Sequence, residues 1–412
     1  MEQINGKTMK LEGRSIKDIE QNIAFQNYLR SGSKGAVIAG TGFGKTRVGV
    51  IAAEDALNCN HHDVLILVPF EHLKDRFREE FKKTGREELL EKVEFHCYAS
   101  AKKVIEERKN YSAIICDEIH LGLTDKCFEL YKLYMDTRML FLTATLPEDP
   151  TYRMRLHVLV PTVYTITLDE CVEKGLVAPY SIECLGVELT EREAKDYKKV
   201  NSNFGYWKQQ LGFDAFKHAQ RVLANKKKYS KLVKAAVGFY RAIRQRKEIV
   251  DHANNKISVA SRLTEEYEGK ILVFGGDNAF TDLLAEGIDG SVVYHSARKA
   301  KEKREALQKF KDGRAYVLCS TKALNQGLDV PDAGIGLICG LTSKALTMIQ
   351  RVGRLVRIDP ENPEKSGKVV VVYVKDSQEE KWLRSALKNI DRSNISWKDA
   401  DVTIEAQSSL VT

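Results

Sequence analysis

The stretch "GAVIAGTGFGKTRVGV" at residues 35–50 contains three alternating glycines followed by Lys45 and Thr46. An apolar, strand-like run ends at Ala39 and a helix is predicted to begin near Lys45, so the glycines form a loop between the two. Such a loop turns backbone N–H groups toward phosphates, the lysine reaches the outer phosphates, and the threonine hydroxyl ligates Mg²⁺. The sequence therefore predicts a phosphate-binding loop made of Ala39, Gly40, Thr41, Gly42, Phe43, Gly44, Lys45 and Thr46.

Two adjacent carboxylates follow another strand-like run. Asp117 and Glu118 stand in "IICDEIH", 72 residues after Lys45. Adjacent carboxylates that leave a strand point in different directions. One can therefore hold Mg²⁺, directly or through water, while the other orients and deprotonates an attacking water. Thr143 and Thr145, in "FLTATLP" at a further strand end, offer hydroxyls that could join this site to neighbouring elements.

Two polar stretches in the second half of the chain offer further phosphate ligands. The first is "STKALNQGLDVPD" at 320–332, and the second is "QRVGRLVRID" at 350–359. In the second, Gln350, Arg354 and Arg357 recur at spacings of four and three, so on a helix they share one face. Arginines presented to phosphate oxygens stabilise charge in phosphoryl transfer, an effect of roughly 10³ to 10⁵ in rate.

Short apolar runs rich in β-branched residues alternate with helix-length charged stretches along most of the chain. The first four runs, "AVIA", "VLILVP", "AIIC" and "MLFLTAT", begin at positions 36, 64, 113 and 139. Such alternation predicts an α/β fold with parallel sheets and helices on both faces. From about 190 to 265 only helical patterns occur, opening on a capping box at Thr190 and Glu193, and strand-like runs then resume at 271. The fold class is therefore two α/β lobes with a helical insertion between them.

Composition and charge restrict the possible classes of protein. With 412 residues, 43% hydrophobic and 30% charged, the chain fits a soluble globular protein of two or three domains. The N-terminus lacks the apolar core of a signal peptide, and no apolar run reaches the ~18 residues that span a bilayer, so we expect a cytosolic protein without a membrane partner. Eight scattered cysteines without a Cys-x-x-Cys pair favour reduced, buried thiols over a zinc site or disulfides.

A basic segment within the helical insertion indicates a polyanionic partner. Residues 221–256 contain eleven Lys or Arg against two acidic residues, while the whole chain carries +8. Aromatic residues precede this segment closely enough to stack on bases or to wedge a junction, although the core of the insertion is the more common role for such residues. These aromatic residues are Tyr197, Phe204, Tyr206, Trp207, Phe213 and Phe216, of which Trp207 is the leading candidate for stacking. The basic residues that could grip phosphates are Lys226, Lys227, Lys228, Arg241, Arg244, Arg246 and Lys247.

The ordered set "AGTGFGKT", "VPFEHL", "DEIH", "TAT", "STKALNQGLDVPD" and "QRVGRLVR" resembles the motifs of superfamily 2 helicases and translocases, whose first motif begins with alanine. The stretch at 163–200 and the helical insertion are similar to the branch that includes XPB, the UvsW helicase and related phage recombination helicases. The resemblance implies two RecA-like lobes that close on ATP. The expected segments are lobe 1 at 1–165, a linker and helical insertion at 166–265, lobe 2 at 266–378 and a helical tail at 379–412.

The resemblance also implies roles for individual residues. Lys45 and Thr46 would bind ATP and Mg²⁺, Asp117 would hold the metal, and Glu118 would be the catalytic base. His120, Thr143 and Thr145 would couple the site to the second lobe. Gln350, Arg354 and Arg357 would close over the γ-phosphate. Gly327 and Asp329 would link nucleotide to nucleic acid, and Gln21 matches the adenine-sensing glutamine. The residues expected to contact nucleic acid are Pro69, Ser100, Ser320, Thr321, Trp207, Lys226, Lys227, Lys228 and Arg244.

The expected activity is ATP hydrolysis coupled to translocation on forked, branched or single-stranded DNA, with fork regression, branch migration or limited unwinding in replication, recombination or repair. Little room separates the motifs at 320–332 and 350–359, so a long strand-splitting hairpin is not expected there. The resemblance further implies 3′→5′ movement and a phage or bacterial source, with the host cytoplasm as location, and we expect a monomer. Two alternatives stay open: an RNA helicase, because nothing in the sequence reads a 2′-hydroxyl, and an inactive nucleic-acid-binding scaffold.

Overall fold

A computed structural model describes residues 15–40, 42–147, 149–321, 333–341, 366–388 and 390–400. The described residues form two compact units, the first ending at Pro179 and the second beginning at Tyr180. Each unit is built on one sheet in which all strands run parallel.

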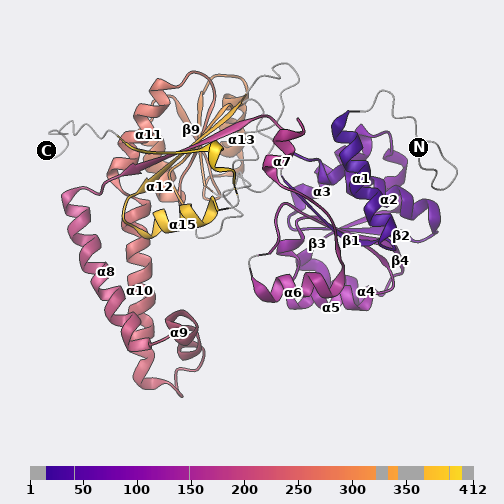
Figure 1. The fold of residues 1–412 in the computed structure, drawn as a ribbon, viewed down its shortest axis with the longest axis horizontal. Helices are drawn as coiled ribbons and strands as arrows, with labels where there is room; N and C mark the ends of the chain where they lie inside the picture. The colour runs from indigo at the N-terminus through magenta and orange to yellow at the C-terminus, as the bar shows by residue number, and fades with distance from the viewer. Residues whose placement is uncertain are drawn as a thin grey trace. The chain divides into compact units, whose positions relative to one another are not determined.

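The first unit is a six-stranded sheet covered by helices on both faces (Figure 1). Its strand order is β3 (Val93–Cys97), β2 (Asp63–Val68), β4 (Tyr111–Cys116), β5 (Arg138–Thr143), β1 (Lys34–Ala39) and β6 (Thr162–Ile166). One face carries α1 (Ile16–Arg30), α2 (Lys45–Cys59) and α3 (Glu71–Lys83). The other face packs against α4 (Ala101–Glu107), α5 (Asp125–Leu133) and α6 (Pro150–Leu159). The central strands are buried almost throughout, which explains why they read as continuous apolar runs.

The parallel arrangement brings the predicted chemistry to one edge of this sheet. Because the strands share one direction, their carboxyl ends lie together. Ala39, Cys116 and Thr143 end β1, β4 and β5, which are adjacent in the sheet. The phosphate-binding loop, the carboxylate pair and the Thr-rich turn therefore follow neighbouring strands.

The second unit is a seven-stranded sheet in the order β13 (Ile395–Asp399), β7 (Tyr180–Val187), β12 (Gly367–Val374), β11 (Ile335–Ile338), β8 (Ile271–Phe274), β10 (Val317–Ser320) and β9 (Ser291–Tyr294). Two helices, α11 (Asn254–Glu266) and α12 (Asn278–Glu286), pack their apolar faces against this sheet. The sheet is also contacted by α13 (Ala300–Lys311) and α15 (Gln378–Ala386).

The helical arm, residues 190–251, is part of this second unit. Its long helices α8 (Glu191–Leu211) and α10 (Val233–Asp251) run side by side away from the sheet, and the short helix α9 (Ala215–Ala224) lies at their far end (Figure 1). The predicted capping box is confirmed, since the Thr190 hydroxyl accepts from the Glu193 N–H at 3.4 Å while the Glu193 carboxylate accepts from the Thr190 N–H at 2.9 Å. The far end has a small core of its own, centred on Phe239.

The structure differs from the expected segments in two places. Strand β7 falls within the expected linker and insertion, but it pairs with β12 and β13 in the second sheet. Its burial alternates only over the first four residues, so it forms one short strand without a clear sequence pattern, next to long helices. The expected helical tail contains, besides α15, the edge strand β13, whose residues are mostly exposed and give no clear apolar pattern.

Two further predictions concern thiols and membranes. All eight cysteines lie in the described ranges as free thiols, seven of them buried as expected, while Cys59 is exposed. Across those same ranges, no helix combines the length and apolar character needed to cross a bilayer.

Candidate nucleotide site and nucleic-acid interface

The loop between β1 and α2 has the backbone that the glycines predict. Gly42 and Gly44 adopt positive φ angles of 95° and 89°, which a side chain would strain, and Gly44 caps the N-terminus of α2. The Lys45 ammonium donates to the Ala39 carbonyl at 2.9 Å and so stays at the mouth of the loop. The N-terminal N–H groups and this ammonium together favour a bound anion.

Gln21 contacts this loop from α1. Its side-chain Nε2 donates to the Phe43 carbonyl at 2.8 Å, and the residue is only 2% exposed. A Cβ on Gly44 would lie 2.3 Å from the same nitrogen, so the glycine is also needed to let Gln21 approach. Within the described residues the Gln21 Oε1 atom is buried without a hydrogen-bond partner, which leaves one acceptor beside the loop. An adenine-sensing role for Gln21 stays a prediction.

The carboxylate pair follows β4 in a tight turn. Asp117 is 4% exposed, and burial, together with the neighbouring Glu118 carboxylate, raises its pKa to about 6. Glu118 adopts a left-handed conformation with φ of 48°, which residues other than glycine rarely adopt. Such strain at a non-glycine residue is typical of functional turns.

His120 and the Thr-rich turn lie beside these carboxylates. The His120 Nδ1 atom is 3.4 Å from Glu118 Oε2 and 3.1 Å from the Thr143 hydroxyl. That hydroxyl donates in turn to the Thr145 carbonyl at 2.9 Å. The structure therefore joins the three residues proposed for coupling in one chain of contacts that begins at Glu118.

The donor set at this edge fits a hard cation. Thr46 is 5% exposed and offers a hydroxyl, while Asp117 offers a buried carboxylate whose pKa is raised by burial and by the Glu118 carboxylate. Oxygen donors of these two kinds are what Mg²⁺ prefers beside nucleotide phosphates. Thr46 and Asp117 are therefore the residues that would hold the ion.

The residues predicted to contact nucleic acid lie in both units, and several other predicted residues fall outside the described ranges. Pro69 and Ser100 follow the carboxyl ends of β2 and β3, at the same edge as the nucleotide loop. In the second unit, the Ser320 hydroxyl donates to the Tyr294 carbonyl at 2.7 Å and the Thr321 hydroxyl to Asn278 Oδ1 at 3.2 Å, and both residues are buried. Six predicted residues lie outside the described ranges: Thr41, Gly327, Asp329, Gln350, Arg354 and Arg357.

The aromatic residues of the helical arm divide into packed and exposed groups. Trp207 packs on α10, where a Cβ on Gly238 would lie 2.4 Å from the indole. This packing argues against Trp207 as the leading candidate for stacking. Phe213 is instead fully exposed, between α8 and α9, and Tyr206 and Phe216 are more than half exposed.

The basic residues of the arm divide in the same way. Arg246 and Lys247 were expected to grip phosphates, but they have internal partners. The Arg246 guanidinium stacks 4.3 Å from the Phe204 ring centroid, and Lys247 forms an ion pair with Asp251. Of the seven basic residues predicted to grip phosphates, the exposed ones are Lys226, Lys227, Lys228, Arg241 and Arg244.

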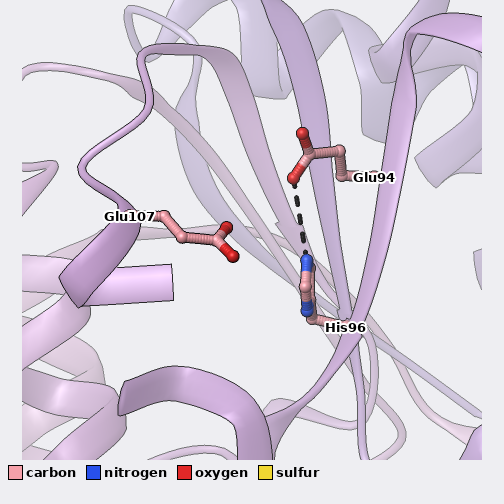
Figure 2. Close-up of side chains that lie close together, drawn as sticks. All are labelled: Glu94, His96 and Glu107. Carbon is pink, nitrogen blue, oxygen red and sulfur yellow. Dashed lines mark ion pairs between the residues drawn. The ribbon is translucent and has the colours of Figure 1, made fainter. Parts of the chain in front are cut away.

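A separate cluster of potential metal ligands lies on the edge strand β3. Figure 2 shows Glu94 and His96 with Glu107, from the end of α4, pointing toward one space, and their ligand atoms lie within 4.8 Å of one another. The Lys109 ammonium already lies 2.5 Å from Glu94 and 3.9 Å from Glu107. Although burial opposes it, hydrogen bonds from Lys109 and Tyr111 lower the pKa of Glu94. The cluster is therefore an ion-pair network around a lysine.

Two families of known proteins resemble different parts of this chain. The model of the family described as "Type III restriction enzyme, res subunit" matches residues 9–148, and that described as "Helicase conserved C-terminal domain" matches 254–359. The first match includes the nucleotide loop and the carboxylate pair. The chain is thus similar to superfamily 2 helicases in both of its α/β units. It is accordingly an ATP-dependent enzyme.

Several known proteins resemble this chain. The DNA 3′-5′ translocase XPB2 of Sulfurisphaera tokodaii is 29% identical over 343 residues, which cover 79% of this chain and 75% of the relative. A 51.5 kDa protein of a Lactococcus phage is 25% identical over 300 residues, which cover 71% of this chain and 56% of the phage protein. The helicase domain of Pyrococcus furiosus Hef superposes with a TM-score of 0.57 at 17% identity, covering 91% of this chain and 98% of that one. The Hef likeness concerns the fold alone, and it confirms the predicted pair of RecA-like lobes.

Proposed function

We propose that this protein is an ATP-driven DNA translocase that remodels forked or branched DNA, moving 3′→5′. The observation that carries the proposal is the convergence of the nucleotide loop, Asp117 and Glu118 at one edge of the first sheet. The choice of DNA and the polarity are supported by the relative named as a DNA 3′-5′ translocase. A role in phage or bacterial recombination, in the host cytoplasm and as a monomer, is part of the same proposal.

The proposed chemistry assigns one role to each residue. Backbone N–H groups of the loop and Lys45 bind the phosphates, and Thr46 with Asp117 holds Mg²⁺. Bound Mg²⁺ would neutralise charge on the β- and γ-phosphates. Glu118, held in a left-handed backbone conformation, orients the attacking water and accepts its proton.

The helical arm supplies the proposed DNA-binding surface of the second unit. Exposed lysines at 226–228 and exposed Arg241 and Arg244 offer charges to phosphates. Phe213, fully exposed in the turn before α9, offers a ring to a base or to a junction. An aromatic ring without packing contacts costs hydrophobic stabilisation, which a nucleic-acid partner would recover.

Energetics favour remodelling over long-range unwinding. Opening duplex DNA costs on average ~1.4 kcal/mol per base step, whereas exchange of one pairing for another is nearly balanced. Because little room separates the motifs at 320–332 and 350–359, we expect no long strand-splitting hairpin between them, and fork regression or branch migration is the remodelling that suits such a motor. Efficient unwinding of long plain duplexes, at the rate at which forks and four-way junctions are rearranged, would contradict this part of the proposal.

An RNA helicase remains the main alternative, because the residues of the proposed ATPase site do not distinguish DNA from RNA by the 2′-hydroxyl. An inactive scaffold is disfavoured because Lys45, Asp117 and Glu118 retain the arrangement that hydrolysis needs.

The deciding experiment measures steady-state ATPase rates without nucleic acid and with single-stranded DNA, duplex, a model fork, a four-way junction and RNA. Glu118→Gln serves as the blank, since it keeps the side-chain volume and removes the proposed base. We expect the strongest stimulation with forked or junction DNA and its loss in the blank. Stimulation by RNA alone would favour the RNA helicase. If no substrate stimulates hydrolysis, the inactive nucleic-acid-binding scaffold would be the function that fits.

A further inference from the structure

Tyr98 lies beneath the turn that carries the two carboxylates. It begins the short helical turn Tyr98–Ser100 after β3 and is 8% exposed. Its hydroxyl donates to the backbone carbonyl of Asp117 at 2.6 Å. Burial raises the pKa of Tyr98 well above its usual range, so the hydroxyl stays protonated and remains a donor. Nothing in the sequence singles this tyrosine out, because an aromatic residue after a strand is most often a core residue.

The aromatic ring of Tyr98 packs against the same turn at Gly122. A Cβ on Gly122, four residues after Glu118, would lie 2.4 Å from the tyrosine Cζ atom. The ring therefore occupies the space that only a glycine leaves open. Between the carbonyl of Asp117 and Gly122 the chain passes through Glu118, whose φ of 48° is sparsely populated. Such a conformation persists where the surroundings fix it, and Tyr98 fixes both ends of the turn.

We propose that Tyr98 is a positioning residue for ATP hydrolysis, which holds the Asp117–Glu118 turn in its hydrolytic conformation without contacting the nucleotide. Tyr98 also belongs to the segment that ends at Ser100, a predicted contact to nucleic acid. A shift of that segment on DNA binding would be transmitted through the tyrosine hydroxyl to the carboxylates. The inference rests on the proposed ATPase activity and adds a residue and a route of coupling to it.

The chain offers a closely matched control. Tyr134 is also 8% exposed, belongs to the same core cluster, and donates its hydroxyl to a backbone carbonyl, that of Lys109, at 2.8 Å. Tyr98→Phe and Tyr134→Phe therefore remove the same kind of hydrogen bond from the same core cluster, although the bond of Tyr98 is the more deeply buried. Only the first removes a bond to the catalytic turn. Gly122→Ala tests the turn independently, by forcing a methyl group against the ring.

The experiment measures kcat and KM for ATP with saturating DNA, together with thermal unfolding, for the wild type and the three variants. We expect Tyr98→Phe and Gly122→Ala to lower kcat by about 10- to 100-fold with KM nearly unchanged, because displacement of catalytic groups by about 1 Å costs up to ~10²-fold. Tyr134→Phe should keep the wild-type kcat, even if both tyrosine variants lose similar thermal stability.

Equal kcat values for Tyr98→Phe and Tyr134→Phe, whether both are normal or both reduced, would overturn the inference. So would a raised KM with unchanged kcat in Tyr98→Phe, since that pattern indicates lost nucleotide binding. A wild type that hydrolyses no ATP on any nucleic acid would refute the proposed function as well, and this result is distinct from an active wild type that tolerates Tyr98→Phe.

Discussion

Replacing Asp117 with asparagine should abolish hydrolysis and make the ligand-free first unit more stable. Burial, together with the Glu118 carboxylate, raises the pKa of Asp117 to about 6, against about 3.9 in an unfolded chain. The folded state therefore keeps its proton to higher pH than the unfolded state does. The carboxyl group favours folding below about pH 4, and this contribution is lost as the pH rises through about 6. Asparagine cannot ionise and so escapes the loss.

The pKa difference sets the size of the effect. A rise from the usual value to about 6 corresponds to as much as roughly 3 kcal/mol at pH 7 and above, and about half of that at pH 5. Relaxation of the site and entry of water reduce this value, so we expect the variant to gain about 1–3 kcal/mol at pH 8. The gain should shrink steadily between pH 6 and pH 4.

The assay is hydrogen exchange of the β4 and β5 amides at pH 8 and pH 5, with each sample corrected for the intrinsic exchange rate. This readout follows the first unit, whereas tryptophan fluorescence follows the second, which contains all three tryptophans, at positions 207, 382 and 397. The reasoning is refuted if Asp117→Asn is no more protected than the wild type at pH 8, or if its gain is the same at both pH values. Mg²⁺ with ATP should stabilise the wild type and much less the variant.

Four further outcomes are expected. Lys45→Ala should lower ATP hydrolysis by ~10²-fold or more without unfolding the protein, as measured by steady-state turnover and calorimetry. Phe213→Ala should weaken binding of forked DNA by about 1–3 kcal/mol without changing the stability of the arm, as measured by fluorescence anisotropy. Trp207→Ala should instead destabilise the arm by up to ~3 kcal/mol, as measured by urea unfolding. If the arm makes about 6–10 phosphate contacts, DNA affinity should fall by ~10³ to 10⁵ between 50 and 200 mM salt, and a flat profile would exclude the basic surface. Lys256→Met should cost the second unit about 3–5 kcal/mol by leaving the buried Glu379 unpaired, and adding Glu379→Leu should recover most of the loss, as followed by tryptophan fluorescence.

The sequence could locate the elements that carry the candidate nucleotide site of the first unit, because each of these elements is local. Strands of the first sheet are buried on both faces, so they appear as continuous apolar runs whose ends can be located to within a residue or two. In a parallel sheet the carboxyl ends share one edge, so residues that follow separate strands are brought together without knowledge of the strand order. The contacts of Gln21 with the loop and of His120 with Thr143 are consistent with this reasoning.

Contacts between distant side chains could not be predicted in this way. In a helical hairpin with its own small core, composition does not distinguish aromatic residues that pack from those that face solvent, so Trp207 was favoured over Phe213. Arg246 and Lys247 count as surface charges in the sequence, but ring stacking and an ion pair engage them in the structure. Tyr98 supports Asp117 through a bond to a backbone carbonyl, which leaves no trace in residue type or spacing.

The carboxyl edge of the first sheet brings together several polar groups that the described residues do not fully pair or neutralise. The buried atoms Gln21 Oε1 and Thr145 Oγ1 have no hydrogen-bond partner among the described residues, and Glu118 Oε2 has the His120 ring nitrogen at 3.4 Å. At the same edge Asp117 is buried with a raised pKa and Glu118 holds a strained backbone. Each of these features costs stability, yet the strands beneath them are buried and uninterrupted, which gives the fold the reserve to hold them in place. A ligand that supplies hydrogen-bond donors to these oxygens and a cation to the carboxylates would relieve these costs together. Nucleotide binding at this edge should therefore stabilise both the Asp117–Glu118 turn and the turn that contains Thr145.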